Sequence, residues 1–509
     1  MQKLTVAIAL MLLLSMLLTM VACDNGTTET SKEQNVSTDA STDTSTSDDE
    51  SRYVANVPTT GFEGETLIFM IRDQEHGVFQ TWDFQSEEFN EEVINDALDA
   101  RNGYIEDTFD VTLEALQVGG ERNYGTMYDK IDLAANAGTE DFDVAYAALY
   151  DMVKLAGNQA LYDVNEIKHI DTTQPWWSQT ALKEITIANR CFGLIGSISV
   201  QINETVQGVL FNKQMFKDNE FGDPYQLVKE DKWFMDTMFS FAKDIYADTG
   251  DLNGQIDIKD TFGIGGQNDT IYNYFYGSNG RTALLDNDGI PTITLDSEAN
   301  VTKLSYLIEK IRDKEVFMNA NDYFNVPGYT SSPSEYIVNA FAEGRMLFYC
   351  EGLLHVNTFR NYDIDFGVLP VPKYDANQED YSHLIGAWGA TCVVFPIHLD
   401  DERLELAGAI VEAMSAESMN TLVPAYYEKL LKKRDTRDEE GEAMLDIIFN
   451  TISIDAGLTF NWGSIKTVFT SMISQGPDSF ASNYDKVESS VKAEMDTTVE
   501  TFQNIPHNY

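Results

Sequence analysis

The chain has 509 residues, 43% of them hydrophobic and 11% aromatic, which is the composition of a globular protein. Its length exceeds what one hydrophobic core usually supports, so at least two lobes are expected. Asp and Glu number 83 against 34 Lys and Arg, which gives a net charge of −49. A surface this acidic repels phosphate groups, and it argues against a nucleic-acid partner and against anionic lipid headgroups.

The first residues have the pattern of a secretory signal. Lys3 is the only charged side chain before an uncharged run over residues 4–22, which matches the basic start and apolar middle of a signal peptide. The run ends in MVAC at residues 20–23, which resembles the lipobox of bacterial lipoproteins. The resemblance implies that residues 1–22 are a lipoprotein signal peptide and that Cys23 is lipidated.

A plain transmembrane anchor is the alternative, because the run approaches the ~20 residues that span a bilayer. Both interpretations place the rest of the chain outside the cell. We favour the lipid anchor, since two acyl chains give stable membrane attachment.

Residues 23–61 are rich in Ser, Thr, Asp and Glu and have almost no large apolar side chain. Such a segment buries too little surface to offset its ordering entropy, so a disordered acidic tether is expected. As a flexible coil of roughly 38 residues it would have a root-mean-square reach of ~35 Å. The body after it holds Cys191, Cys350 and Cys392, which cannot all pair and are expected to be isolated buried thiols.

Three strands and two helices alternate in the first part of the body. Short or alternating apolar runs predict strands at 66–71, 111–115 and 142–147. Apolar positions at helical spacing predict helices at about 86–105, capped by Ser86, and at about 124–137. This alternation indicates a parallel sheet with crossover helices.

The same pattern resumes after a break around residues 171–177. Strands are predicted at 209–211, 262–264, 346–349, 365–369 and 390–395, and helices at 233–247, 300–313, 334–343 and over most of the last 85 residues or so. Ligands bind at the carboxyl ends of strands in open α/β sheets. That rule selects the loops after Ile71, Tyr146, Phe211, Ile264, Tyr349 and Leu369.

Four segments resemble a known group by their order and spacing. They are residues 137–144 (AGTEDFDV), 208–216 (GVLFNKQMF), 341–346 (FAEGRM) and 366–370 (FGVLP). Together they resemble the family 1 extracellular solute-binding proteins, the carbohydrate-type receptors of ABC importers. The likeness extends from about residue 66 to the C-terminus.

The resemblance implies an α/β fold of the two-lobe type II periplasmic-binding-protein kind, with a hinge and an interlobe cleft. One lobe would hold residues 62–172 and 366–422, and the other 173–365 and 423–509. The resemblance further implies a binding protein without enzymatic activity, lipid-anchored on the extracellular face of the cell membrane. Its partners would be a small solute, a mono- or oligosaccharide, and the membrane subunits of an ABC transporter. A monomer that requires no cofactor is expected.

A sugar receptor needs aromatic platforms for flat apolar sugar faces, with carboxylates and amides for the hydroxyls. The resemblance places cleft aromatics at Tyr146, Tyr150 and Trp462. The remaining candidates lie in loops or after predicted strands and are Trp388, Asp73, Glu351, Gln201 and Asn268. Ordinary packing explains any one of these residues about as well as ligand contact. Trp176, Trp177 and Trp233 are assigned to lobe packing.

Residues 249–260 (TGDLNGQIDIKD) match the spacing of a twelve-residue calcium loop. The oxygen-bearing positions are Thr249, Asp251, Asn253, Gln255 through its carbonyl, Asp257 and Asp260. Threonine at the first position and aspartate at the last remove charge, so any calcium would bind weakly and structurally. An acidic surface loop without an ion explains the pattern equally well.

Catalytic signatures are absent from the sequence. It contains no H-E-x-x-H, no G-x-x-x-x-G-K-S/T and no G-x-S-x-G, and residues 263–266 (GIGG) are interpreted as a strand-end turn. Two alternatives stay open, an exported glycoside hydrolase with two opposed carboxylates and a surface adhesin or peptide receptor. Product formation from oligosaccharides would identify the hydrolase. An adhesin should lack a closing cleft, and calorimetry against sugar and peptide panels would separate a peptide receptor from a sugar receptor.

Overall fold

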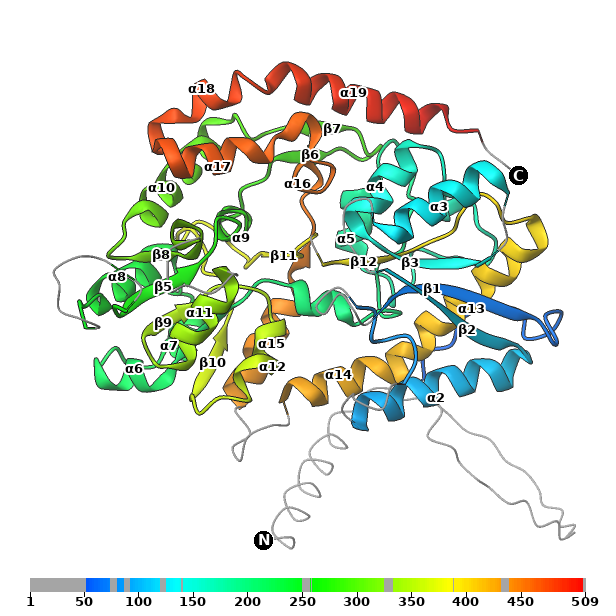
Figure 1. Cartoon of the computed structure of the whole chain (residues 1–509), viewed down its shortest axis with the longest axis horizontal. Helices are drawn as coiled ribbons and strands as arrows, with labels where there is room; N and C mark the ends of the chain where they lie inside the picture. Colours follow the sequence, from blue (N-terminus) through cyan, green and yellow to red (C-terminus); the bar gives the residue numbers. More distant parts are fainter. Residues whose placement is uncertain are drawn as a thin grey trace, which may run out of the picture. The chain divides into compact units, whose positions relative to one another are not determined.

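Two β-sheets organise the body of the protein (Figure 1). The computed structural model describes residues 52–73, 80–86, 92–119, 125–138, 141–249, 257, 259–324, 333–387, 389–431 and 439–506. Residues 52–509 form one compact unit. The expected signal peptide, Cys23 and most of the expected tether lie outside the described residues.

The first sheet is the centre of lobe I and has the strand order β12-β3-β1-β2. Its strands are β1 (Thr66–Arg72), β2 (Thr112–Val118), β3 (Val144–Ala148) and β12 (Thr391–Val394). β1 pairs in parallel with both β2 and β3, which confirms the predicted parallel sheet. β12 arrives from a distant part of the chain and pairs antiparallel with β3.

The helices of lobe I are α2 (Glu92–Phe109), α3 (Thr126–Ala137), α4 (Leu149–Gly157), α13 (Asp401–Asn420) and α14 (Leu422–Leu431). α2 and α3 connect the parallel strands, as the helical spacing predicted. α14 packs against α2 and α13, so the expected lobe boundary at residue 422 is too early. The chain leaves lobe I only after this helix.

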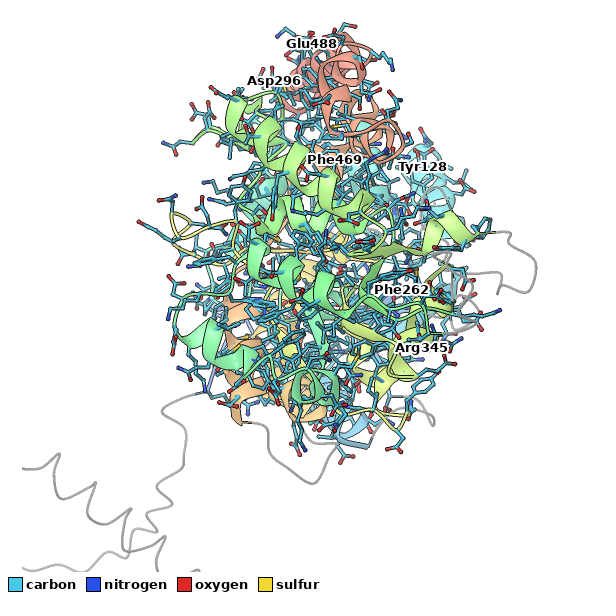
Figure 2. The ribbon with its side chains drawn as sticks, turned by 90° about the vertical axis from the view of Figure 1, so that its left-hand side faces the viewer. Tyr128, Phe262, Asp296, Arg345, Phe469 and Glu488 are labelled. Carbon is cyan, nitrogen blue, oxygen red and sulfur yellow. The ribbon has the colours of Figure 1, made fainter. Side chains whose placement is uncertain are left out.

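The second sheet is the centre of lobe II and has the strand order β10-β4-β9-β5-β8. Its strands are β4 (Val209–Asn212), β5 (Phe262–Gly266), β8 (Phe317–Asn319), β9 (Met346–Tyr349) and β10 (Phe366–Leu369). β5 pairs in parallel with β8 and β9. Figure 2 views this lobe, with Phe262 of β5 near Arg345, whose carbonyl accepts a 2.9 Å hydrogen bond from the Phe262 amide.

The helices around the second sheet are α6 (Lys213–Asp218), α7 (Pro224–Lys229), α8 (Met235–Ile245), α9 (Thr270–Gly277), α10 (Glu298–Arg312), α11 (Pro333–Ala342), α12 (Leu354–Phe359) and α15 (Glu439–Asn450). The C-terminal part forms α16 (Ala456–Phe460), α17 (Lys466–Gln475), α18 (Phe480–Tyr484) and α19 (Glu488–Asn504). Smaller elements are α5 (Gln179–Ile185), β6 (Ala283–Leu285), β7 (Pro291–Ile293), β11 (His383–Leu384), β13 (Ile452–Ser453) and the 3₁₀ turns η2 (Val164–Glu166), η3 (Gln201–Thr205), η4 (Ala320–Tyr323), η5 (Trp462–Ser464) and η6 (Pro477–Ser479).

β10 corrects the expected division of the chain. It was assigned to lobe I from residue 366 onward, but it pairs antiparallel with β4 in the lobe II sheet. The chain therefore returns to lobe I between β10 and β12. Strand pairing decides this point, because a short apolar run does not reveal which sheet its backbone joins.

The residues just after Ser51 correct the expected tether. Arg52 pairs with Glu417 of α13 at 2.6 Å, and its guanidinium lies 4.5 Å from the Tyr104 ring centroid of α2. The Tyr53 amide donates to the Asn420 side chain at 3.0 Å, and that side chain donates back to the Tyr53 carbonyl at 2.9 Å. The expected tether of 23–61 is therefore too long at its C-terminal end.

The interior confirms the assignments of the tryptophans and the thiols. Trp176, Trp177 and Trp233 are buried, with 0% of Trp233 exposed. Cys191, Cys350 and Cys392 are free and buried. In the described part of the chain, no helix has the length and apolar character needed to cross a membrane.

Glu412 of α13 receives two buried indole N–H groups. Its carboxylate accepts hydrogen bonds from Trp176 Nε1 at 3.1 Å and Trp177 Nε1 at 3.0 Å. Burial raises the pKa of Glu412 to about 7, although these donors oppose the rise. The unfolded carboxyl titrates near ~4.3. The folded state therefore binds the Glu412 proton more tightly than the unfolded state does, and this difference adds to the free energy of unfolding. The added stability is fully present below the unfolded pKa and is lost as pH rises through about 7.

We expect the melting temperature of the protein to fall between pH 5 and pH 8, with Glu412 contributing on the order of 2–3 kcal/mol. The Glu412→Gln variant should be less stable at pH 5, because its single side-chain oxygen replaces the two carboxyl oxygens that accept from Trp176 and Trp177. Its melting temperature should change less with pH, because glutamine does not titrate. Thermal unfolding followed by circular dichroism checks this. Equal pH slopes for the two proteins would contradict it.

The glycines of residues 263–266 lie within β5 and not in a strand-end turn as interpreted. A Cβ at Gly263 would overlap the backbone of Ala242 in α8, whereas a Cβ at Gly265 would meet the end of the Met346 side chain. Backbone atoms in a packed layer cannot yield, but a methionine terminus can change rotamer. Gly263 is therefore the close-approach point between β5 and α8.

We expect Gly263→Ala to lower the free energy of unfolding by about 3 kcal/mol or more and Gly265→Ala by about 1 kcal/mol. The two substitutions add the same methyl group to the same strand, so each controls for the other. Urea denaturation gives both values. A Gly265→Ala variant at least as unstable as Gly263→Ala would refute the argument.

Candidate functional site

A cavity of about 380 Å³ is lined by residues from both lobes. Lobe I contributes Tyr150 of α4, and lobe II contributes residues that follow β5 and β9. Larger surface hollows of about 540 Å³ beside Tyr225 and about 650 Å³ beside Tyr374 are lined by lobe II alone. We take the 380 Å³ cavity as the candidate site because both lobes form its walls.

Two parallel strands of lobe II end at the cavity. Gln267 and Asp269 follow β5, and Glu351 and Gly352 follow β9. The carboxyl ends of neighbouring parallel strands meet at one edge of a sheet, where their loops converge. The loops predicted after Ile264 and Tyr349 therefore do line the site.

The segments that cross between the lobes form another wall. The Gln207 amide donates to the Leu384 carbonyl of β11 at 3.2 Å, and the Ile385 amide donates to the Ser453 carbonyl of β13 at 2.8 Å. Gln207, Leu384 and Ile385 all line the cavity. Three separate stretches of chain thus lie side by side where the lobes join (Figure 1).

Two tyrosine rings face the cavity from opposite lobes. Tyr150 belongs to α4 of lobe I and Tyr272 to α9 of lobe II, and both are half-buried. The Lys466 ammonium lies 4.2 Å from the Tyr150 ring centroid and hydrogen-bonds the Tyr150 hydroxyl. The Tyr272 ring packs edge-on against Phe469 of α17, which Figure 2 labels, with 5.2 Å between centroids. These contacts hold both rings in place.

Burial shifts the pKa values of two cavity residues, Glu351 and His355. Burial raises the pKa of Glu351 to about 8, the Asp269 charge adds to the rise, and the Thr270 hydroxyl, which donates at 3.3 Å, opposes it. Burial lowers the pKa of His355 to about 4. His355 is therefore neutral at pH 7, and Glu351 is mostly protonated while the cavity holds no cation.

The structure brings Tyr150 and Glu351 together in the cavity, as expected. Tyr146 lies elsewhere, because β3 runs to Ala148 and Tyr146 is inside the strand rather than after it. Its side chain is 0% exposed, with its ring centroid 6.2 Å from that of Phe69 and 5.8 Å from that of Phe84. Tyr146 is a core residue of lobe I, and its assignment to the ligand site is corrected.

Trp462 is also a core residue rather than a cavity residue. Only 2% of it is exposed, its ring stacks on Phe460 at 5.0 Å, and its Nε1 donates to the Thr498 hydroxyl of α19 at 3.0 Å. The final helix covers the tryptophan, which its sequence neighbourhood did not reveal. Trp388 lies outside the described residues, so its assignment stays a prediction.

Gln201 and Asn268 form hydrogen bonds that position neighbouring loops. The Gln201 side chain donates to the Gln80 carbonyl, and its backbone amide donates to Asp83 at 2.8 Å. Asn268 accepts from the Asn319 side chain at 2.8 Å and holds the loop after β5 against the end of β8. Neither residue lines the cavity.

Asp73 directly follows β1, and its amide donates to the Val118 carbonyl at 2.9 Å. It is not among the cavity-lining residues either. The rule that ligands bind at the carboxyl ends of strands correctly placed Asp73 at the edge of the lobe I sheet. It did not show that the cavity lies beside other strands.

The expected calcium loop is described only in part. Thr249 shares a 3.0 Å hydrogen bond with the Thr261 hydroxyl, and the buried Asp260 accepts from the Asp257 amide at 2.9 Å. Asp251, Asn253 and Gln255 lie outside the described residues. The described residues include no cluster of three or more His, Cys, Asp or Glu fit to hold a metal ion. Calcium binding by this loop stays a prediction.

Cavity residues that were not predicted include Gln207, Gln267, Asp269, Tyr272, His355 and Lys466. Gln267 and Asp269 flank the predicted Asn268, so the rule chose the correct loop and the wrong side chain. Tyr272 begins the aromatic-rich stretch YNYFY at residues 272–276, directly after that loop. Lys466 carried no such signal, because only the tertiary fold brings it to Tyr150.

The model of the bacterial extracellular solute-binding protein family matches residues 101–423, which is more than half of the chain. The chain belongs to this family. As a family member it is a solute-binding protein whose relatives are extracellular binding proteins, in agreement with the resemblance of its sequence segments. No curated protein sequence matches this binding protein at a significant level.

Solved structures confirm the two-lobe fold of the binding protein. A cyclo/maltodextrin-binding protein in complex with maltotetraose superposes with a TM-score of 0.53 at 11% identity, over 88% of this chain and 98% of the other. UspC of M. tuberculosis superposes with a TM-score of 0.53 at 13% identity, over 84% of this chain and 100% of the other. At these identities the similarity establishes the fold alone.

Proposed function

We propose that this protein captures a mono- or oligosaccharide in the cavity between its lobes and delivers it to the membrane subunits of an ABC transporter. The observation that supports this proposal is the pair of rings, Tyr150 and Tyr272, that face one cavity from opposite lobes. Aromatic rings offer flat apolar platforms, and the surrounding amides and carboxyls suit hydroxyl groups. A ligand that contacts both rings would draw the lobes together by hinge bending.

The fold neighbours agree with a saccharide ligand. The cyclo/maltodextrin-binding protein of similar fold is itself complexed with maltotetraose. We assign no catalytic role to Glu351 and Asp269, because the family consists of binding proteins. Incubation with oligosaccharides should leave them intact, and released products would identify a hydrolase instead.

Isothermal titration of the purified chain against neutral mono-, di- and trisaccharides tests saccharide capture. We expect one-site binding, together with a smaller radius of gyration in small-angle scattering when the ligand is added. Binding without compaction would contradict closure of the lobes. Absence of binding to every saccharide, with binding to peptides, would contradict the proposal itself.

We further propose that Cys23 carries the lipid anchor and that the protein works as a monomer on the outer face of the cell membrane. The MVAC sequence at residues 20–23 supports the anchor. Expression of a Cys23→Ala variant should move the protein from the membrane fraction to soluble fractions or leave its signal peptide uncleaved. Unchanged processing and membrane attachment would show that another feature anchors it.

A further inference from the structure

The part of the cavity next to β5 and β9 is rich in hydrogen-bond acceptors. Glu351 and Asp269 contribute carboxyl groups, and Gln207 contributes the side-chain oxygen Oε1. Gln207 is only 3% exposed, and its Oε1 is buried without a hydrogen-bond partner among the described residues. A buried acceptor without a donor costs free energy, which a ligand donor would recover.

Glu351 and Asp269 follow the neighbouring strands β9 and β5, Gln207 lines the same cavity, and we call these three groups the acceptor end. The backbones of Gln207 and Gly352 form an antiparallel bridge, so Gln207 lies beside the residue that follows Glu351. A Cβ built at Gly352 would lie 3.7 Å from Nε2 of Gln207, which places the amide next to the end of β9. Asp269 is close enough for its charge to act on Glu351.

Glu351 has no cationic neighbour within the described part of the chain that forms an ion pair with it. The groups that favour its charged form are the neutral donors of Thr270 and Gln267. They leave its pKa raised to about 8. A half-buried carboxyl with a raised pKa gains most from a cation that approaches it. The net charge of −49 would also draw cationic solutes toward the protein and repel anionic ones.

The other ionisable groups that face the cavity do not fill this role. Lys466 reaches it from α17, and its ammonium is held against the ring and hydroxyl of Tyr150 on α4. His355 of α12 is neutral because burial lowers its pKa to about 4. We infer that a cation that matches Glu351 comes from the ligand.

We propose that the acceptor end binds a protonated primary amine, so that the preferred ligand is a cationic amino sugar rather than a neutral saccharide. The inference rests on the proposed capture of saccharides in this cavity. An ammonium group has three donors and no acceptor, which matches Glu351, Asp269 and Gln207 Oε1. N-acetylation would remove both the charge and two of the three donors, and a hydroxyl in place of the amine would supply one donor without charge.

Three disaccharides that differ only at carbon 2 of each ring test the proposal. Isothermal titration of the full chain in detergent at pH 6.5 compares the β-1,4 disaccharide of glucosamine with its N-acetylated form and with cellobiose. We expect the amine to bind at least about tenfold more tightly than either. We also expect amine binding to release a proton, because the cation ionises Glu351, so the measured heat should differ between two buffers of unlike ionisation enthalpy.

Variants assign the effect to the acceptor end. Glu351→Gln should abolish the proton release and bring the three affinities within about threefold of each other. Asp269→Asn should weaken amine binding severalfold and weaken cellobiose binding less. Asp244→Asn makes the same charge change at an exposed position of α8 outside the cavity, and it should alter neither. If Glu351→Gln does not fold, two measurements still test whether the amine binds at the acceptor end. They are the two-buffer titration of the unmodified chain and the amine affinity of the variant Asp269→Asn, whose side chain is exposed.

The results separate this inference from the proposed function. Equal or tighter binding of cellobiose without proton release would overturn the amine proposal and leave saccharide capture standing. Preference for the amine that persists unchanged in both Glu351→Gln and Asp269→Asn would place the amine elsewhere and also overturn it. Failure of the full neutral and amino saccharide series to bind would overturn both.

Discussion

Replacing Tyr272 by alanine should lower the affinity for the bound saccharide by roughly tenfold to a hundredfold. Tyr272 lines the cavity from α9, and its ring is held by Phe469. A ring that covers an apolar sugar face contributes about 1.5–3 kcal/mol through buried area and ring contact, which corresponds to this change in affinity. Isothermal titration with the saccharide that binds the unmodified protein measures the loss.

Tyr272→Phe is the matched control, because it keeps the ring and removes only the hydroxyl. We expect its affinity to stay within about threefold of the original. Circular dichroism of both variants confirms that loss of the Phe469 contact has not unfolded α9. An alanine variant that binds as tightly as the original would exclude Tyr272 as a ligand platform.

Replacing Trp233 by alanine should lower the free energy of unfolding by about 3–5 kcal/mol. Trp233 is 0% exposed, its ring lies 5.8 Å from that of Phe348 in β9, and its Nε1 donates to the Pro370 carbonyl at 2.8 Å. The alanine variant leaves a large cavity beside the lobe II sheet. It also leaves the Pro370 carbonyl without its donor.

Trp233→Phe separates the two causes. It keeps most of the ring and loses the N–H donor, so its cost should be smaller, about 1–3 kcal/mol. Urea denaturation followed by far-ultraviolet circular dichroism measures both variants. A loss below about 1 kcal/mol in the alanine variant would mean that lobe II repacks around the missing side chain.

The strand and helix positions could be predicted closely from local patterns. The apolar run at residues 346–349 is β9 at the same bounds, and the helix expected at 334–343 is α11 at Pro333–Ala342. These predictions succeed because side-chain periodicity is imposed by the local backbone. The two-residue strands β11 and β13 were missed, since a run that short carries no periodicity.

The candidate site was predictable as a set of loops and only partly as a set of side chains. The strand-end rule found the loops after β5 and β9, and Glu351 was correctly placed in one of them. Tyr146 was misplaced because it lies inside β3, which continues to Ala148, and not in the loop after the strand. Trp462 was misplaced because α19 returns across it, a contact over 36 residues of sequence.

The sequence alone determined the alternation of strands and helices, the need for two lobes and the family likeness, because these depend on periodicity, length and local motifs. Only the tertiary structure decided that β10 joins the lobe II sheet and that Lys466 meets Tyr150. The same is true of Gln207, whose backbone pairs with Gly352 in the loop after β9. Such contacts join residues far apart in the chain, and their partners are set by strand pairing and packing, which no local pattern of residues records.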